Sequence, residues 1–114
     1  MHPSDAVRLS QLGVDGIWVS NHGGRQLDGA IASVDALRSI AQAVEGKVSL
    51  LIDSGVRRGV DVLKARAMGA EAVAIGRASL FGAAAAGESG VRQALKILTD
   101  ELTLAMKLSG VASI

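Results

Sequence analysis

Two nine-residue stretches, LGVDGIWVS at 12–20 and MGAEAVAIG at 68–76, carry the pattern that decides the fold. In each, a helical pattern ends at a glycine, two small or polar residues follow, and a short apolar run comes next. A short apolar run bounded by turn residues predicts a buried strand. The recurrence of helix, glycine and strand is typical of βα repeats, in a (β/α) barrel or in an open doubly wound sheet.

The rest of the chain continues this alternation. The pattern predicts strands at 16–20, 48–52 and 72–75 and helices at 5–12, 33–44, 60–68 and 91–108, with a short helix after GRASLFG at 76–82. Ser4 is the expected N-cap of the first helix. The last helix should bury an apolar stripe made of Val91, Leu95, Leu98, Leu102 and Met106.

Strands that alternate with helices predict a parallel sheet covered by helices. A complete barrel needs eight strands in roughly 250 residues. The 114 residues of this chain hold three strands, so it is either a small open sandwich or a piece of a larger barrel. We expect one domain over residues 1–114.

Composition narrows the function classes. Hydrophobic residues make up 49% of the chain, which fits a packed core. The net charge is +1 and the basic residues are scattered, so the charge pattern does not predict binding to nucleic acid or to a membrane surface. Cysteine is absent, which excludes disulfides and thiolate metal sites. The longest apolar run, at 80–86, is too short to cross a bilayer. We therefore expect a cytoplasmic protein without a membrane segment.

The loop after the first strand, SNHGGRQLDGA at 20–30, holds the densest group of reactive side chains. His22 can accept a proton near neutral pH, and Asp28 could hold the protonated imidazole. Arg25 offers a planar fork for a carboxylate or phosphate, and the two glycines after His22 would let the backbone approach a flat ligand. The alternative is a surface loop whose histidine and arginine are merely solvated.

The loop after the second strand begins with Asp53, a costly carboxylate at the end of a buried strand unless it is hydrogen-bonded. Ser54 and Gly55 permit a tight turn, and Arg57 follows. Arg58, one residue further, is interpreted as a solvated residue at the start of a helix.

Gly76 and Arg77 follow the third strand and precede another helix. Two strand-to-helix loops with glycine and arginine predict a phosphate site, because backbone N–H groups and the positive helix end attract an anion. All three loops lie at the carboxyl ends of their strands, the edge where parallel α/β sheets bind ligands.

Three segments together resemble the carboxyl-terminal part of the FMN-dependent 2-hydroxy acid dehydrogenases and oxidases, the family of L-lactate dehydrogenase, glycolate oxidase and mandelate dehydrogenase. They read SNHGGRQLDGA (20–30), LLIDSGVRRGVDVLKARAMGAEAVAIGRASLFG (50–82) and GVRQALKILTDELTLAMKLSGVASI (90–114). The first is the most specific, and the other FMN barrels share looser forms of DSGVRRG and IGR. The resemblance covers nearly the whole chain.

This resemblance implies a fold and a cofactor. The chain would be about strands six to eight, with their helices, of a (β/α)₈ TIM barrel that binds FMN at its carboxyl face. The activity would be oxidation of an L-2-hydroxy acid such as lactate to a 2-oxo acid, as part of a larger enzyme.

The resemblance also implies roles for single residues. His22 matches the base that takes the hydroxyl or α-proton, Asp28 its acidic partner, and Arg25 the clamp on the substrate carboxylate. Asp53, Ser54, Gly55, Arg57, Gly76 and Arg77 match the FMN-binding segments. Ser54 stands where many members have glycine.

The family's flavin-contacting lysine and substrate-binding tyrosines are expected before Met1, and this chain contains no tyrosine. We therefore expect a half-barrel fragment that pairs with the missing half or with a second copy, and whose full-length parent could associate peripherally with a membrane. One alternative function is a non-catalytic fragment that binds FMN or phosphate weakly, or is inert. Another is an FMN barrel of different chemistry, such as a type 2 isopentenyl diphosphate isomerase or a relative of inosine monophosphate dehydrogenase. The motif NHGGRQLD argues against this second alternative.

Overall fold

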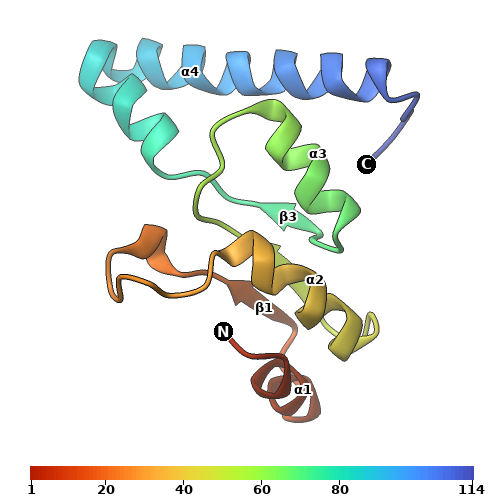
Figure 1. The fold of residues 1–114 in the computed structure, drawn as a ribbon. Helices are drawn as coiled ribbons and strands as arrows, with labels where there is room; N and C mark the ends of the chain where they lie inside the picture. The colour runs from red at the N-terminus through yellow and green to blue at the C-terminus, as the bar shows by residue number, and fades with distance from the viewer. The chain divides into compact units, whose positions relative to one another are not determined.

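A parallel sheet of three strands organises the first part of the chain. The computed structural model describes all residues 1–114, and its strands are β1 (Gly16–Val19), β2 (Ser49–Ile52) and β3 (Ala72–Val73), in the order β1-β2-β3 (Figure 1). The register of β1 and β2 runs from Gly16 opposite Ser49 to Val19 opposite Ile52. The predicted parallel sheet is therefore confirmed. The third strand is shorter than predicted, although the N–H of Ala74 still donates to the carbonyl of Ile52 at 2.8 Å.

Four α-helices alternate with these strands. Their bounds are α1 (Pro3–Gln11), α2 (Ser33–Val44), α3 (Gly59–Ala67) and α4 (Arg77–Leu108). The predicted bounds of α2 are confirmed, and those of α3 differ by one residue at each end.

Helix α1 begins two residues earlier than predicted, and its N-cap is His2 instead of Ser4. The imidazole Nδ1 of His2 accepts a hydrogen bond from the N–H of Ser4 at 3.2 Å. Pro3 follows at the first helical position, where its fixed φ suits a helix and its missing N–H costs nothing. The prediction of Ser4 as the cap was wrong because the side chain that accepts the bond belongs to a residue without the usual capping signature.

The two helices predicted after the third strand form one element, α4, with a break inside it. Ala86 and Gly87 have non-helical backbone angles, and Gly87 has φ +55°. Helical backbone resumes before the predicted start at Val91. Of the predicted apolar stripe only Leu98 is buried, whereas Leu95 is exposed.

Contacts within the chain divide it into two compact units. The first unit contains residues 1–55 and 65–74, and the second contains residues 56–64 and 75–114. The prediction of a single domain over residues 1–114 stays a prediction.

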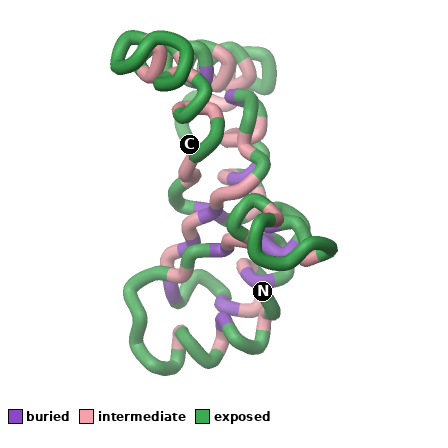
Figure 2. The backbone as a smooth tube through the Cα atoms, turned by 90° about the vertical axis from the view of Figure 1, so that its left-hand side faces the viewer, coloured by how far each residue is buried: buried purple, intermediate pink, exposed green.

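The core of the first unit lies on one face of the sheet. Figure 2 shows where the buried positions of the chain lie. Val19 and Ile52 of the sheet pack there with Leu37 and Val44 of α2, and each is at most 2% exposed. These apolar side chains hold α2 against β1 and β2 because burying each one is worth about 2 kcal/mol.

The other face of the sheet is open around one aromatic side chain. In the register of the sheet Trp18 lies opposite Leu51, and Leu51 lies opposite Ala72, so the three share a face. Trp18 is 57% exposed, and Leu51 is half-buried. A strand with so large an exposed apolar side chain lacks cover on this face.

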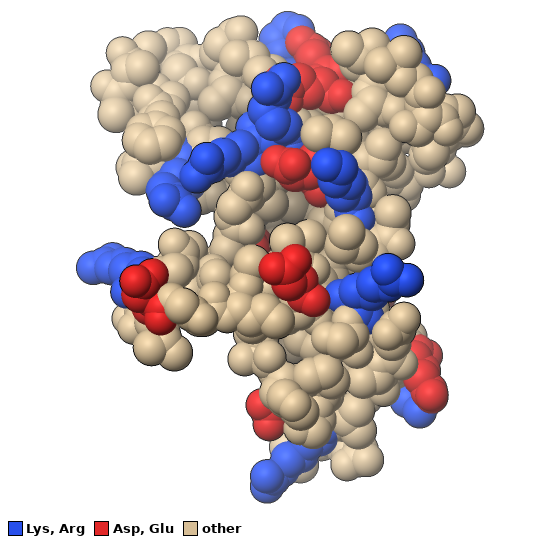
Figure 3. All heavy atoms as spheres, viewed as in Figure 1, with Lys and Arg blue, Asp and Glu red and all other residues tan.

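Charged side chains of both signs are spread over the face seen in Figure 3. No helix of this chain has both the length and the apolar character required to cross a membrane.

Candidate functional site

The loop after β1 has an unusual backbone. It opens with η1 (His22–Gly24), in which three successive residues have positive φ: His22 at +56°, Gly23 at +67° and Gly24 at +79°. Glycine adopts this left-handed conformation readily, whereas a histidine there is uncommon and costs of order 1 kcal/mol. The two glycines therefore make the turn, and His22 is held in a conformation that the surrounding contacts must maintain.

Polar side chains around His22 supply those contacts. The N–H of His22 donates to Oγ of Ser20 at 3.1 Å, and the N–H of Asn21 donates to Oγ of Ser33 at 3.0 Å. Oδ1 of Asn21 accepts from the N–H of Gly24 at 3.2 Å. Ser33 is buried at the first residue of α2, so it anchors the loop to the core.

Sequence reasoning missed this scaffold of Ser20, Asn21 and Ser33. Asparagine and serine are the residues that bond to nearby backbone in turns, which is the signal that could have found the first two. Ser33 is twelve residues from its partner, and no local pattern pairs them.

A hydrogen bond joins this loop to the one after β2. The N–H of Gly23 donates to Oγ of Ser54 at 3.0 Å, and the hydroxyl of Ser54 donates to Oδ1 of Asp53 at 2.7 Å. Ser54 has φ +74° and Gly55 has φ +81°, so a left-handed turn follows this strand too. The structure therefore brings the histidine loop to Asp53 and Ser54 at the carboxyl edge of the sheet, as predicted from the order of strands and loops.

The three reactive side chains of the first loop point to no partner within the chain. His22, Arg25 and Asp28 are all exposed. Their side chains make no hydrogen bond or ion pair, and the imidazole and the Asp28 carboxylate are not joined. The loop thus presents a base, a guanidinium and a carboxylate with free hydrogen-bonding capacity.

In the second unit, carboxylates already occupy the amino end of α3. Oδ2 of Asp61 accepts from the N–H groups of Arg57 and Arg58 at 3.0 and 2.9 Å, and Oε2 of Glu101 accepts from the N–H of Gly59 at 2.8 Å. These oxygens satisfy the donors that would otherwise face an anion. The backbone N–H groups of Arg57, Arg58 and Gly59 therefore have partners within the chain, whereas the guanidinium of Arg57 is exposed. The phosphate role of this helix end stays a prediction.

Arg58 makes an ion pair instead of being merely solvated. Its Nε donates to Oε1 of Glu101 at 2.8 Å, although the arginine side chain is exposed. The interpretation of Arg58 as a residue without a ligand role is compatible with this contact, because its guanidinium is engaged by the chain itself.

The amino end of α4 is free. Gly76 is its N-cap and makes no side-chain cap bond, and the first hydrogen bond of the helix runs from the N–H of Leu80 to the carbonyl of Gly76 at 3.2 Å. The N–H groups of residues 77–79 therefore lack intrahelical partners. Space around the Cα of Gly76 is open and Arg77 is exposed, so this end has the chemistry that a phosphate group requires.

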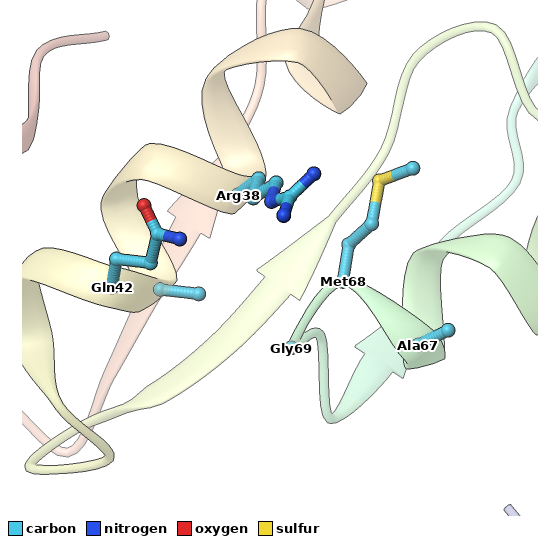
Figure 4. Close-up of a pocket in the computed structure, with 6 residues that line it drawn as sticks. Arg38, Gln42, Ala67, Met68 and Gly69 are labelled. Carbon is cyan, nitrogen blue, oxygen red and sulfur yellow. The ribbon is translucent and has the colours of Figure 1, made fainter.

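A shallow groove of about 450 Å³ lies elsewhere in the first unit (Figure 4). It is formed by α2, by the end of α3 and by the turn after α3, and its lining residues are Arg38, Ala41, Gln42, Ala67, Met68 and Gly69. None of these is a predicted site residue. The groove contains no group of side chains suited to proton transfer, so the loops at the carboxyl edge of the sheet are the better candidate.

Comparison with known proteins gives one family and close relatives. The family described as FMN-dependent dehydrogenase matches residues 1–114. The chain is 54% identical over 114 residues to an L-lactate oxidase of Lysinibacillus sphaericus (strain C3-41), which covers 100% of this chain and 30% of that protein. It is 57% identical over 106 residues to 2-hydroxyacid oxidase 1 of Mus musculus, covering 93% of this chain and 29% of that protein.

A solved structure agrees with this assignment. A mutant mandelate oxidase with a monooxide FMN adduct matches at a TM-score of 0.93 and 50% identity, covering 97% of this chain and 35% of that chain. The match confirms the predicted fold class, a carboxyl-terminal portion of a (β/α)₈ barrel. The chain spans about 30% of the length of the curated relatives it matches.

Proposed function

Because this chain belongs to the FMN-dependent dehydrogenase family, we propose that it is the part of a 2-hydroxy acid oxidase or dehydrogenase that provides the base, the carboxylate clamp and the phosphate-binding residues. The proposed reaction is oxidation of an L-2-hydroxy acid, such as lactate, to the 2-oxo acid. The observation that carries the proposal is the hydrogen bond from Gly23 to Ser54, which holds the loop of His22 at the carboxyl edge of the parallel sheet.

In the first unit, Arg25 binds the substrate carboxylate through two parallel N–H donors, which orients the hydroxyl-bearing carbon. His22 accepts the proton from the substrate, either from its hydroxyl oxygen or from its α-carbon. FMN, when bound, would supply an acceptor for the two electrons and the second hydrogen that leave the substrate as its carbonyl forms. Asp28 stabilises the imidazolium that results through its negative charge.

The cofactor-binding residues are proposed separately for each unit. In the first, Asp53 and Gly55 line the carboxyl end of β2, where the open, left-handed Gly55 leaves room for a ligand. In the second, the guanidinium groups of Arg57 and Arg77 and the free N–H groups after Gly76 are suited to a phosphate.

The first test is flavin binding by equilibrium dialysis of the chain with FMN. We expect retention of FMN that weakens in Arg77→Ala and is kept in Arg92→Ala, whose guanidinium pairs with Glu88 on an exposed face of α4. Equal retention by the two variants would contradict the phosphate role of Arg77.

The second test is turnover, in a longer protein that contains this chain. Lactate, glycolate and mandelate are supplied with an artificial electron acceptor. His22→Ala should abolish turnover while leaving bound FMN in place, since the imidazole acts on the substrate. Turnover that persists in His22→Ala would rule out the base assignment.

A second candidate function is a non-catalytic half-barrel that binds FMN or phosphate weakly, or is inert. The exposed Trp18 on the uncovered face of the sheet favours it for the isolated chain, because an apolar face of this kind is normally covered by further protein, such as more barrel strands or a second copy. Flavin retention without turnover in the isolated chain would support this function. The cytoplasmic location expected from the sequence stays a prediction.

A further inference from the structure

We propose that Ser54 is a positioning residue: its hydroxyl fixes the backbone of the His22 loop against Asp53, and it is not a ligand of FMN. This inference rests on the proposed role of His22 and changes the assignment of Ser54 made from the sequence.

The hydrogen-bonding capacity of Ser54 supports this role. A serine hydroxyl has one donor hydrogen and two acceptor lone pairs. Its hydrogen is committed to Oδ1 of Asp53 at 2.7 Å, and one lone pair accepts from the N–H of Gly23 at 3.0 Å. The hydroxyl therefore has no hydrogen left to donate to a phosphate or ribityl oxygen. Because the acceptor Asp53 is a carboxylate, the Ser54–Asp53 bond is of the stronger, charge-assisted kind.

The hydrogen bond between Gly23 and Ser54 also fixes the orientation of His22. Gly23 directly follows His22, so the hydrogen bond fixes the peptide plane on the carboxyl side of the histidine. His22 has φ +56°, and its own N–H donates to Ser20, which is only two residues away in the sequence. The bond to Ser54 spans 31 residues and is the contact that ties η1 to the neighbouring strand. Its loss should let the histidine leave its orientation while the sheet stays intact.

Ser54 itself has φ +74°, a conformation that glycine adopts more easily. A glycine here would relax the backbone but remove the acceptor for Gly23. The serine therefore gives the loop a contact that glycine cannot give, and the two effects can be separated by mutation.

The experiment compares Ser54→Ala with Ser54→Gly in the 114-residue chain by amide hydrogen exchange and by NMR titration of the His22 imidazole. Both variants lack the hydroxyl, but only glycine relieves the left-handed backbone. We expect both to speed exchange of the Gly23 amide by about fivefold, the effect of losing one typical hydrogen bond. Both should also shift the His22 ring signals, and FMN affinity should stay within about twofold of the unchanged chain.

Ser39→Ala is the matched control, because its hydroxyl donates to the carbonyl of Ala36 within α2 and makes no contact with the loop. Exchange at Gly23 should be unchanged in this control. If Ser54→Ala fails to fold, Ser54→Gly alone decides the outcome.

Unchanged Gly23 exchange in Ser54→Gly would overturn the inference, as would a loss of FMN affinity as large as that of Arg77→Ala. If the chain retains no FMN, the proposed cofactor function fails, whereas the Gly23 and His22 signals still decide the role of Ser54. In a longer active protein, Ser54→Gly should lower kcat more than it raises KM, since the proton acceptor is misplaced and the Arg25 clamp is kept.

Discussion

The N–H of Gly59 donates to Oε2 of Glu101 at 2.8 Å at a point where the backbones of α3 and α4 come so close that no side chain fits on Gly59. A Cβ on Gly59 would overlap the backbone nitrogen of Leu102 and lie 2.5 Å from the carbonyl oxygen of Leu98. Within the second unit, this glycine therefore sets how near the start of α3 can approach α4.

Gly59→Ala should destabilise the chain by about 3 kcal/mol or more, because backbone atoms on both sides of the new methyl group cannot move aside as a flexible side chain would. Chemical denaturation measures the change. Gly76→Ala is the control, since the space around Gly76 is open and the same added methyl group should cost far less. Equal effects of the two substitutions would mean that α3 and α4 can move apart at no cost.

Glu101→Ala should cost about 1–3 kcal/mol, because it leaves the buried N–H of Gly59 without an acceptor. Glu101→Gln keeps an acceptor oxygen and should cost less, which separates the hydrogen bond from the ion pair with Arg58. Thermal unfolding of both variants tests this. A larger loss in the glutamine variant would show that charge, not the accepted hydrogen bond, matters here.

Ser33→Ala should loosen the histidine loop without melting α2. The hydroxyl of Ser33 accepts from the N–H of Asn21, so its removal frees that N–H at a cost of about 1 kcal/mol. Faster amide exchange at Asn21, with unchanged exchange at Leu37 in the core of α2, is the expected result. Faster exchange at both sites would instead indicate that the helix itself depends on Ser33.

The pKa of the Glu45 carboxyl lies below its ordinary value of 4.5, first because Lys47 donates a side-chain hydrogen bond to it and second because of the positive charge of Lys47. Since the pKa of Glu45 is lower in the folded chain than in the unfolded chain, the Glu45–Lys47 pair stabilises the fold fully at pH values above the unfolded pKa. This stabilisation is lost as the pH falls through the folded pKa. Both side chains are largely exposed, so salt should weaken the effect.

Lys47→Met should return the Glu45 pKa toward its ordinary value, measured by NMR titration of the carboxyl carbon. Lys107→Met is the control, because Lys107 makes no ion pair. A Glu45 pKa that stays low in Lys47→Met would assign the shift to another cause.

Features set by neighbouring residues were predictable from the sequence. The apolar positions Leu37, Ile40 and Val44 recur at helical spacing, and they specify the bounds of α2 and the face it buries. The carboxyl-edge position of the His22 loop followed from the order of strands and loops alone.

Features that depend on distant residues were not predictable. Glu101 is 42 residues from Gly59, so no local pattern indicated that the amino end of α3 is already occupied. The Gly23–Ser54 hydrogen bond likewise joins the loop after β1 to the loop after β2, and it exists only once the parallel register of these strands has formed. The residues that break α4 are Ala86 and Gly87, and Gly82 and Gly90 approach each other so closely beside this break that neither has room for a side chain.

Trp18 is the only tryptophan, and the chain contains no tyrosine. The tryptophan fluorescence of the chain therefore comes from a single side chain, which is 57% exposed on the uncovered face of the sheet. Any protein surface that covers this face should move the emission to shorter wavelength, and an acrylamide quencher should then lose access to the ring. The fluorescence of Trp18 thus reports whether this face of the sheet is covered.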